Sequence, residues 1–122
     1  MAVLDDVATR LRAAAVVEGA TGWELALSFE PATPDKLVIV TETGGREPHP
    51  DFRYLSFQVR VRGAQFGYAT AKTQIEAVRD ALHNQTVGSG IYCYARSDVL
   101  MTGYDGNERP VLSLNFETMV AE

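Results

Sequence analysis

A strict alternation of apolar and polar residues in the stretch YLSFQVRVRG, residues 54–63, constrains this fold more than any other sequence feature. The apolar positions are Leu55, Phe57, Val59 and Val61. The polar positions are Tyr54, Ser56, Gln58, Arg60 and Arg62. Because successive side chains of a β-strand point to opposite faces, this period of two predicts a half-buried strand. Residues 111–120 alternate in the same way, so the chain is expected to build a sheet with one face in a core.

Three further segments are predicted to be strands. In residues 23–30 the side chains of Trp23, Leu25, Leu27 and Phe29 share one face, and Pro31 and Pro34 follow and interrupt the ladder. Residues 37–40 are apolar on both faces, which indicates a strand covered on both sides. Residues 91–96 form the fourth strand in chain order, before the alternating strand at 111–120. The segments 41–51 and 97–110 are predicted to be long loops.

Two segments have helical periodicity. The first carries an apolar stripe and is expected to end near Gly19; its stripe is Leu4, Val7, Ala8, Leu11, Ala14 and Ala15. The second runs from about Thr70 to His83 and has Ala71, Ile75, Val78 and Leu82 on one face. Its start matches a capping box at Thr73–Glu76, although Thr70 is an equally good cap.

The order of these elements, α-β-β-β-α-β-β, predicts an α+β fold with one domain over residues 1–122. We expect a mixed or antiparallel sheet of about five strands, with two helices packed on one face.

Composition excludes several classes of protein. The net charge of −5 argues against duplex nucleic acid as the main partner, because such binding depends on neutralising phosphates. The one cysteine, Cys93, cannot form an internal disulfide and is expected to be a buried small hydrophobe. No segment approaches the roughly 20 apolar residues that span a bilayer, so no membrane association is expected.

A search for catalytic and metal-binding groups finds no candidate constellation. His49 and His83 are far apart in the sequence, and no histidine, cysteine or acidic pair has metal-ligand spacing. The DGNER segment at Asp105 begins like a calcium loop but lacks the rest of that pattern, so a turn is expected. We therefore expect no enzymatic activity, no cofactor and no metal.

Two polar strand faces remain as candidate contact surfaces. One carries Arg60 and Arg62, and the other carries Tyr92, Tyr94 and Arg96. Tyrosine and arginine are favoured at protein interfaces. The alternative is that both are solvated outer faces of a one-sided sheet.

Two stretches of the chain, taken with the helix between them, resemble the tail terminator proteins of long-tailed bacteriophages, also called minor capsid or tail-completion proteins. They are LVIVTETGGREPHPDFRYLSFQVRVRG and GSGIYCYARSDVLMTGYDGNERPVLSLNFETMV. The similarity covers residues 35–120 and depends on the order of short motifs. It implies a virion protein that forms a ring, usually hexameric, caps the tail tube, stops its growth and joins the head.

The resemblance also implies partners and contact residues. The expected partners are further copies of the chain, the tail tube protein and the head–tail connector or stopper, with DNA passing through the lumen without specific binding. Candidate interface residues are Gly44, Gly45, Arg46, Arg60, Arg62, Tyr92, Tyr94, Arg96, Asp105 and Arg109. Arg109 is expected to pair with acids of its own loop, and Glu42, Glu47, Asp51 and Asp98 are candidates for the lumen lining.

Two other functions stay open at this point: a small-ligand-binding or enzymatic α+β domain, and an adaptor that dimerises through its tyrosine and arginine face. For the ring, we expect Arg60→Glu combined with Arg62→Glu to leave the monomer folded and to abolish assembly.

Overall fold

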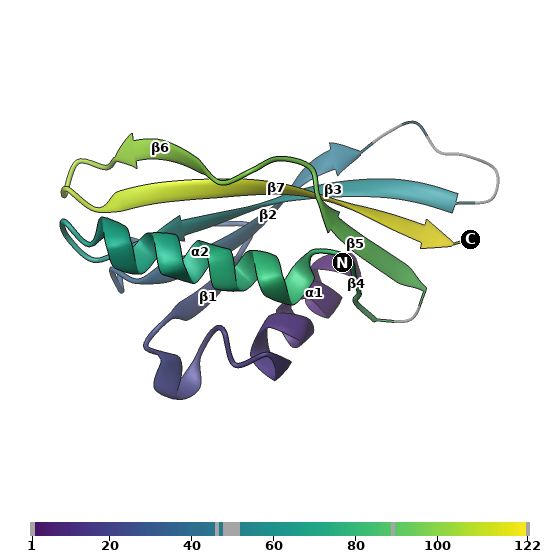
Figure 1. Ribbon diagram of the computed structural model, residues 1–122, viewed down its shortest axis with the longest axis horizontal. Helices are drawn as coiled ribbons and strands as arrows, with labels where there is room; N and C mark the ends of the chain where they lie inside the picture. The colour runs from purple at the N-terminus through teal and green to yellow at the C-terminus, as the bar shows by residue number, and fades with distance from the viewer. Residues whose placement is uncertain (1, 46, 48–51, 89, 122) are drawn as a thin grey trace.

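One curved sheet with both helices on the same face makes up the computed structural model, which describes residues 2–45, 47, 52–88 and 90–121 (Figure 1). The helices are α1 (Ala2–Ala13) and α2 (Tyr68–Leu82), and a short 3₁₀ helix η1 spans Gly19–Thr21. The strands are β1 (Glu24–Leu27), β2 (Leu37–Gly45), β3 (Phe52–Arg62), β4 (Gln85–Thr86), β5 (Ile91–Ala95), β6 (Leu100–Tyr104) and β7 (Pro110–Ala121). Their order in the sheet is β1-β2-β3-β7-β5-β4, and β6 also pairs with β7.

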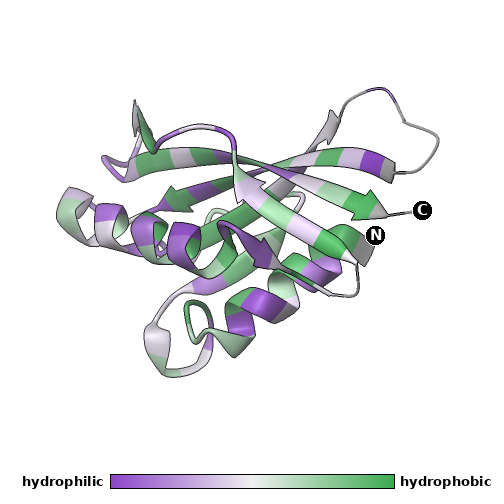
Figure 2. Cartoon of the chain, turned by 45° about the vertical axis from the view of Figure 1, so that its right-hand side comes forward, coloured by the Kyte–Doolittle hydropathy of each residue, from purple (hydrophilic) through white to green (hydrophobic). Residues whose placement is uncertain are grey.

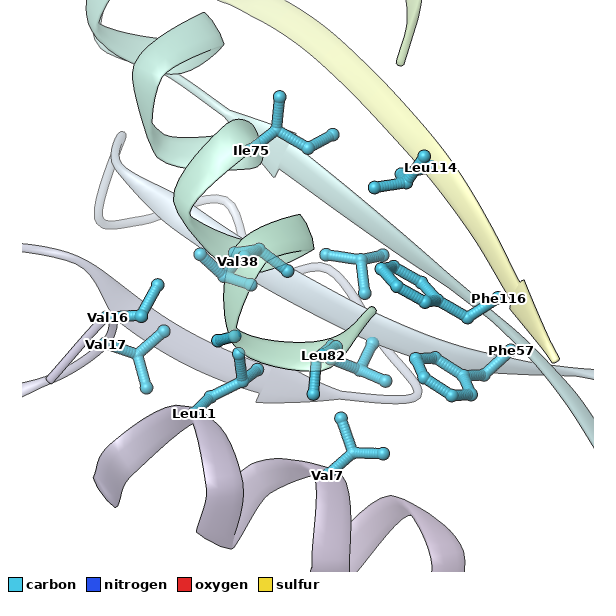
Figure 3. Close-up of a cluster of buried hydrophobic side chains, with 14 of the residues drawn as sticks. Val7, Leu11, Val16, Val17, Val38, Phe57, Ile75, Leu82, Leu114 and Phe116 are labelled. Carbon is cyan, nitrogen blue, oxygen red and sulfur yellow. The ribbon is translucent and has the colours of Figure 1, made fainter. Parts of the chain in front are cut away.

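The antiparallel pair β3–β7 forms the centre of the sheet. Its register places Phe57 opposite Phe116 and Arg62 opposite Val111. The two phenylalanine rings stack with centroids 5.1 Å apart, and both are almost fully buried (Figure 3). The alternation predicted for these two strands is therefore confirmed, and it positions one face of each strand in the core.

The helices cover this apolar face because each carries an apolar stripe. Hydrophobic and hydrophilic residues alternate around both helices, and the hydrophobic side is turned to the sheet (Figure 2). Val7 and Leu11 of α1 and Ile75 and Leu82 of α2 are fully buried (Figure 3). The buried amide of Gln74 donates to the carbonyl oxygen of Val16 at 2.7 Å, which ties α2 to the segment after α1.

β1 and β2 are parallel, which requires the chain to cross over the sheet between them. The connection, residues 28–36, contains Pro31 and Pro34 and is neither helix nor strand. Because the helices occupy one face, this crossover passes over the other. We call that other side of the sheet the helix-free face. There the crossover lies against the end of the sheet where Leu37, Arg62 and Val111 are side by side.

The α+β class, the mixed sheet and the one-sided packing of the helices are confirmed, but several local predictions are wrong. Among the described residues the sheet has seven strands, because β6 lies inside the predicted loop 97–110 and the short β4 lies before β5, where no strand was predicted. The predicted loop 41–51 begins as strand, since β2 extends to Gly45.

Helix ends and one core residue also differ from prediction. α1 ends at Ala13, and Ala14 and Ala15 are exposed, because Ala15 has a positive φ of 56°. α2 is preceded by Gly67 and has no side-chain cap; the Thr73 hydroxyl instead donates to the Ala69 carbonyl. Phe29 is 66% exposed, because the chain turns out of the ladder at Ser28, whose φ is 72°.

Candidate interaction surface on the helix-free face

Arg62 is buried, which contradicts the prediction that it lies exposed on a contact face. It is 1% exposed, and all five of its N–H groups have acceptors. The acceptors are the carbonyl oxygens of Pro31, Ala32, Pro34 and Asp35 and the carboxylate of Glu30. Burial and the nearby charge of Arg109 lower the pKa of this guanidinium from its ordinary value, and it stays a cation at neutral pH.

The physical reason is the crossover itself. Carbonyl groups in a proline-containing segment outside helix and strand have no ladder partners, and buried carbonyls need donors. A guanidinium offers five donors in one plane, so a single arginine can bind four carbonyls of this segment. The strand parity predicted the face of Arg62 correctly but not that another segment covers it.

Three other predicted residues lie at the same place. Arg60 forms an ion pair with Glu30, which also binds Arg62. Arg109 is 7% exposed; it donates to the Ala32 carbonyl at 2.8 Å and pairs with Asp35 at 3.2 Å and with Asp105 at 2.7 Å. The predicted local ion pair of Arg109 with Asp105 is thus confirmed. We call the group Arg60, Arg62, Arg109, Glu30, Asp35 and Asp105 the crossover clamp.

Asp105 closes the turn between β6 and β7. Its carboxylate accepts from the backbone N–H of Arg109 at 3.0 Å and of Asn107 at 2.9 Å. These hydrogen bonds, that of Arg109 foremost, hold the pKa of Asp105 below its ordinary value. The crossover clamp is therefore a structural unit that fixes the crossover and this turn.

The remaining predicted residues that the structure describes gather at the other end of the sheet, around a shallow hollow of about 320 Å³ on the helix-free face. Its lining residues come from the neighbouring strands β2, β3 and β7 and from Arg96, which follows β5: Thr43, Gly45, Ser56, Arg96, Asn115, Phe116 and Glu117. Beside it the rings of Tyr92 and Tyr94 lie 5.6 Å apart. Tyr92 is 38% exposed and donates from its hydroxyl to Asn84.

Glu117 is the polar centre of this region, although the sequence did not single it out. Its side chain is 4% exposed, and it accepts hydrogen bonds from the Tyr94 hydroxyl and from Arg96, the latter at 3.1 Å. A buried carboxylate needs such partners. Arg96 itself stays half exposed, so one of its sides is held and the other is open to a neighbouring molecule.

Gly44 and Gly45 end β2 at the rim of the hollow, and Arg46 lies outside the described residues. Gly44 has a φ of 99°, and nothing lies within 4 Å of the position a Cβ would take. At Gly45 a Cβ would collide with the backbone oxygen of Tyr54, so a side chain is excluded there.

Histidine, cysteine and acidic side chains are the groups that could hold a metal or act as nucleophiles. Among the described residues, no cluster of three or more histidine, cysteine or acidic side chains is suited to hold a metal. Cys93 is fully buried, and burial raises the pKa of its thiol to about 12, which disfavours a nucleophilic thiolate. The Nδ1 atom of His83 accepts from the backbone of Ala95, and His49 is outside the described residues. In the part of the chain that the structure describes, no helix has the length and apolarity to cross a membrane.

Glu30 and Asp35, like Glu117, were missed as functional partners. The only signal in the sequence was the pair of arginines on one strand face, since an arginine that is buried needs several acceptors. Nothing in the sequence, however, shows that β1 and β2 are parallel, and only that pairing brings residues 28–36 over Arg62.

The chain is similar to known proteins both in sequence and in fold. The sequence model of the family described as "Bacteriophage tail terminator protein" matches residues 14–121. No curated protein matches the chain significantly. Among solved structures, a chain of the "Virion of native gene transfer agent (GTA) particle" is similar, with a TM-score of 0.63 and 23% identity over 95% of this chain and 92% of that one. This likeness shows a shared fold.

Proposed function

Because the chain belongs to the bacteriophage tail terminator family and is thus a structural protein of the virion tail, we propose that it caps the growing tail tube as a hexameric ring. The cap stops polymerisation of the tube and presents the surface that joins the head. The family match over residues 14–121 is the observation that carries this proposal. The proposed role is non-enzymatic and uses no cofactor.

A ring needs two different contact patches on each copy, related by a rotation that closes. The helix-free face around the hollow supplies one candidate, with Gly44, Gly45, Tyr92, Tyr94 and Arg96. Exposed tyrosine and half-exposed arginine side chains suit a protein contact. We propose that this face meets a neighbouring virion subunit, either another copy of the chain or the tail tube.

The crossover clamp is not part of this contact surface. Arg62 and Arg109 are buried inside one copy. Replacing Arg60 and Arg62 by glutamate would therefore unfold the crossover, and the expected folded but non-assembling double variant does not follow from the structure.

The other proposed partners are the tail tube protein on one side and the head–tail connector on the other. DNA passes through the lumen without specific binding, since an acidic chain repels phosphates. Of the acids considered for the lumen, Glu42, Glu47 and Asp98 are exposed, and Asp51 lies outside the described residues.

The test is tube assembly from the tail tube protein of the same phage, with and without this protein, followed by electron microscopy. We expect tubes that stop growing and carry a ring at one end when the protein is present. An unchanged length distribution with no protein at the tube ends would refute capping.

An adaptor that acts as a dimer is the second candidate, favoured by the paired tyrosines on the helix-free face. Native mass spectrometry separates the two. A two-fold dimer that does not bind tubes supports the adaptor, and a ring supports the cap.

A further inference from the structure

Besides the outer sides of the terminal strands β1 and β4, two strand edges have no partner strand among the described residues, and they lie on opposite sides of the sheet. β1 pairs with β2 only from Leu37 to Val40, so the outer side of Thr41–Gly45 is open. β6 pairs with β7 on one side, and its other side is open. An unpaired edge presents a row of N–H and C=O groups, which is a template for a strand of another chain.

Both edges carry a glycine at an irregularity. The register of β2 shifts between Glu42 and Gly44, and that of β6 shifts between Met101 and Gly103. Gly44 and Gly103 have φ values of 99° and 124°, and nothing lies within 4 Å of either missing Cβ. Glycine inside a strand often marks a place where another backbone approaches closely. A bulge also shortens the regular part of an exposed edge, which limits pairing with the strands of unrelated chains.

The direction of the open backbone groups follows from the hydrogen bonds that neighbouring residues of the same strands make. On β2, the Val40 carbonyl accepts from Ser28 on the β1 side. Because backbone groups alternate along a strand, those of Glu42 point to the same side, beyond the end of β1. On β7, the Asn115 carbonyl accepts from Arg96, so Ser113 also faces β6, where it pairs with Leu100. The N–H of Met101 therefore points away from β7, along the open edge.

The two edges are also placed suitably for a head-to-tail contact. β2 and β3, β3 and β7, and β7 and β6 are each antiparallel, so β6 runs opposite to β2. Gly45, at the end of the open part of β2, pairs with Leu55 of β3, which pairs with Thr118 of β7. β6 instead pairs with the start of β7, from Pro110 to Ser113, so the two open edges are offset along the strand direction. In Figure 1, β2 accordingly ends at the upper right and β6 lies at the upper left. A sheet that closes into a barrel needs such an offset between its first and last strands. The offset also means that a neighbouring copy paired with the open part of β2 would not collide with β1.

We propose that β6 of one copy pairs antiparallel with Thr41–Gly45 of the next copy, so that the sheet continues from subunit to subunit around the ring. This inference rests on the ring of the proposed function. The contact is heterologous, as a ring requires, because each copy contributes β6 on one side and β2 on the other.

Exposed apolar side chains on β6 favour the same contact. Leu100 is 59% exposed and Tyr104 is 49% exposed. Leu100 pairs with Ser113, and Ser113 pairs with Arg60 of β3. Because paired residues point to the same face of a sheet, the side chain of Leu100 lies on the helix-free face. In the pair proposed here it comes to the rim of the hollow formed by Thr43 and Gly45. Each contact thus buries apolar area as well as backbone groups.

The test removes one outward N–H at a time. Glu42→Pro deletes an N–H that no described residue of the same copy accepts, and Glu42→Ala is its matched control, which keeps the N–H. Proline is tolerated where its nitrogen faces away from the ladder. Met101→Pro, with Met101→Ala as control, does the same on β6. Native mass spectrometry gives the oligomer, and circular dichroism confirms that each variant is folded.

We expect both proline variants to be monomeric and both alanine variants to form rings. A 1:1 mixture of the two proline variants should form a heterodimer, since β6 of the Glu42→Pro chain and β2 of the Met101→Pro chain are intact. A contact between identical edges would instead let the proline variant whose contacting edge is intact form a homodimer by itself, and would overturn the proposal.

Rings formed by Glu42→Pro, or by Met101→Pro if the first variant does not fold, would also overturn edge pairing. So would a wild-type protein that stays monomeric at every concentration. Capping is measured separately, on tube length with the wild-type protein. A cap that works while the proline variants still form rings leaves the proposed function intact and refutes only this contact.

Discussion

Arg60 and Arg62 show that two arginines on the same face of one strand can differ widely in burial and in hydrogen bonding. Both have the parity of the helix-free face, and both contact Glu30. Arg60 keeps 37% of its side chain exposed, whereas Arg62 keeps 1% and binds four backbone carbonyls. The difference depends on which residue lies beneath the crossover, and it separates a structural arginine from a surface one.

Arg62→Met should destabilise the protein by about 3–5 kcal/mol, because it removes one partner of Glu30 and leaves the carbonyls of Pro31, Pro34 and Asp35 without the donor that they have in the wild type. Arg60→Met is the matched control on the same face, and its cost should be about 1 kcal/mol or less, as for partly exposed ion pairs. Urea unfolding measures both. Equal stabilities for the two variants would show that the buried arginine does not hold the crossover.

Because of Asp105, the free energy of unfolding should depend on pH. Its folded-state pKa is lowered, first by the hydrogen bond from the Arg109 backbone, so the unfolded chain binds the proton more readily. Its contribution is therefore complete above the unfolded value of about 3.9 and is lost as the pH falls through the folded value.

The measurement compares wild type and Asp105→Asn by urea unfolding at several pH values. The wild type should be more stable at neutral pH, and the difference should shrink toward strongly acidic pH. A difference that stays constant over this range would exclude the carboxylate as its source.

At the scale of elements, β3 and β7 hold the molecule together. They pair over eleven residue positions, and both helices pack on their apolar face. The second face of β2 has its own small cluster, in which Leu37 and Ile39 contact Ala26. The crossover and the β6–β7 turn are joined to this frame by the crossover clamp, so three segments distant in sequence depend on one another.

Phe57→Ala and Phe116→Ala should each cost about 3–5 kcal/mol, as for large core aromatics. Their stacked rings should add a coupling energy of about 0.5–1.5 kcal/mol in a double-mutant cycle. Phe57→Ala with Ile39→Ala serves as the control pair, because Ile39 lies in the separate cluster on the other face. That pair should be additive within about 0.5 kcal/mol. A coupling near zero for the phenylalanines would contradict the stacking.

At the scale of the whole molecule, the helix-free face has two ends with different roles. One end is closed by the crossover and its arginines. The other holds the hollow, the tyrosine pair and the open edge of β2. An antiparallel sheet can leave such a face in water, and a virion subunit can also bury it against a neighbour. The family membership favours the second outcome.

Tyr92→Glu should change the unfolding free energy by about 1 kcal/mol or less, because the side chain is partly exposed and makes one hydrogen bond. It should nevertheless prevent tail assembly, since a charge would be buried in the contact. Tyr68→Glu is the matched control, with 40% exposure against 38%, at the start of α2.

Electron microscopy of rings and capped tubes reads out the effect. If Tyr92→Glu forms no rings, the helix-free face contacts the neighbouring copy of the chain. If the variant forms rings that do not cap tubes, this face contacts the tail tube. Normal tails from Tyr92→Glu would show that the face is simply solvated.

Local patterns in the sequence were enough to predict the α+β class and the faces of β3, β7 and α2, and they contain no recognisable catalytic motif. Periods of two and of about four are local properties, so Phe57, Phe116, Ile75 and Leu82 could be assigned to the core from neighbours a few residues away. The order of short motifs likewise indicated the tail terminator family.

What covers the polar faces depends on tertiary contacts, which these local patterns do not contain. Arg62 is buried because β1 and β2 are parallel and the segment that connects them passes over the Arg62 side chain. β6 became a strand because β7 continues past β5 and offers it an edge. Both outcomes depend on segments far apart in sequence coming together, which alternation along one strand does not encode.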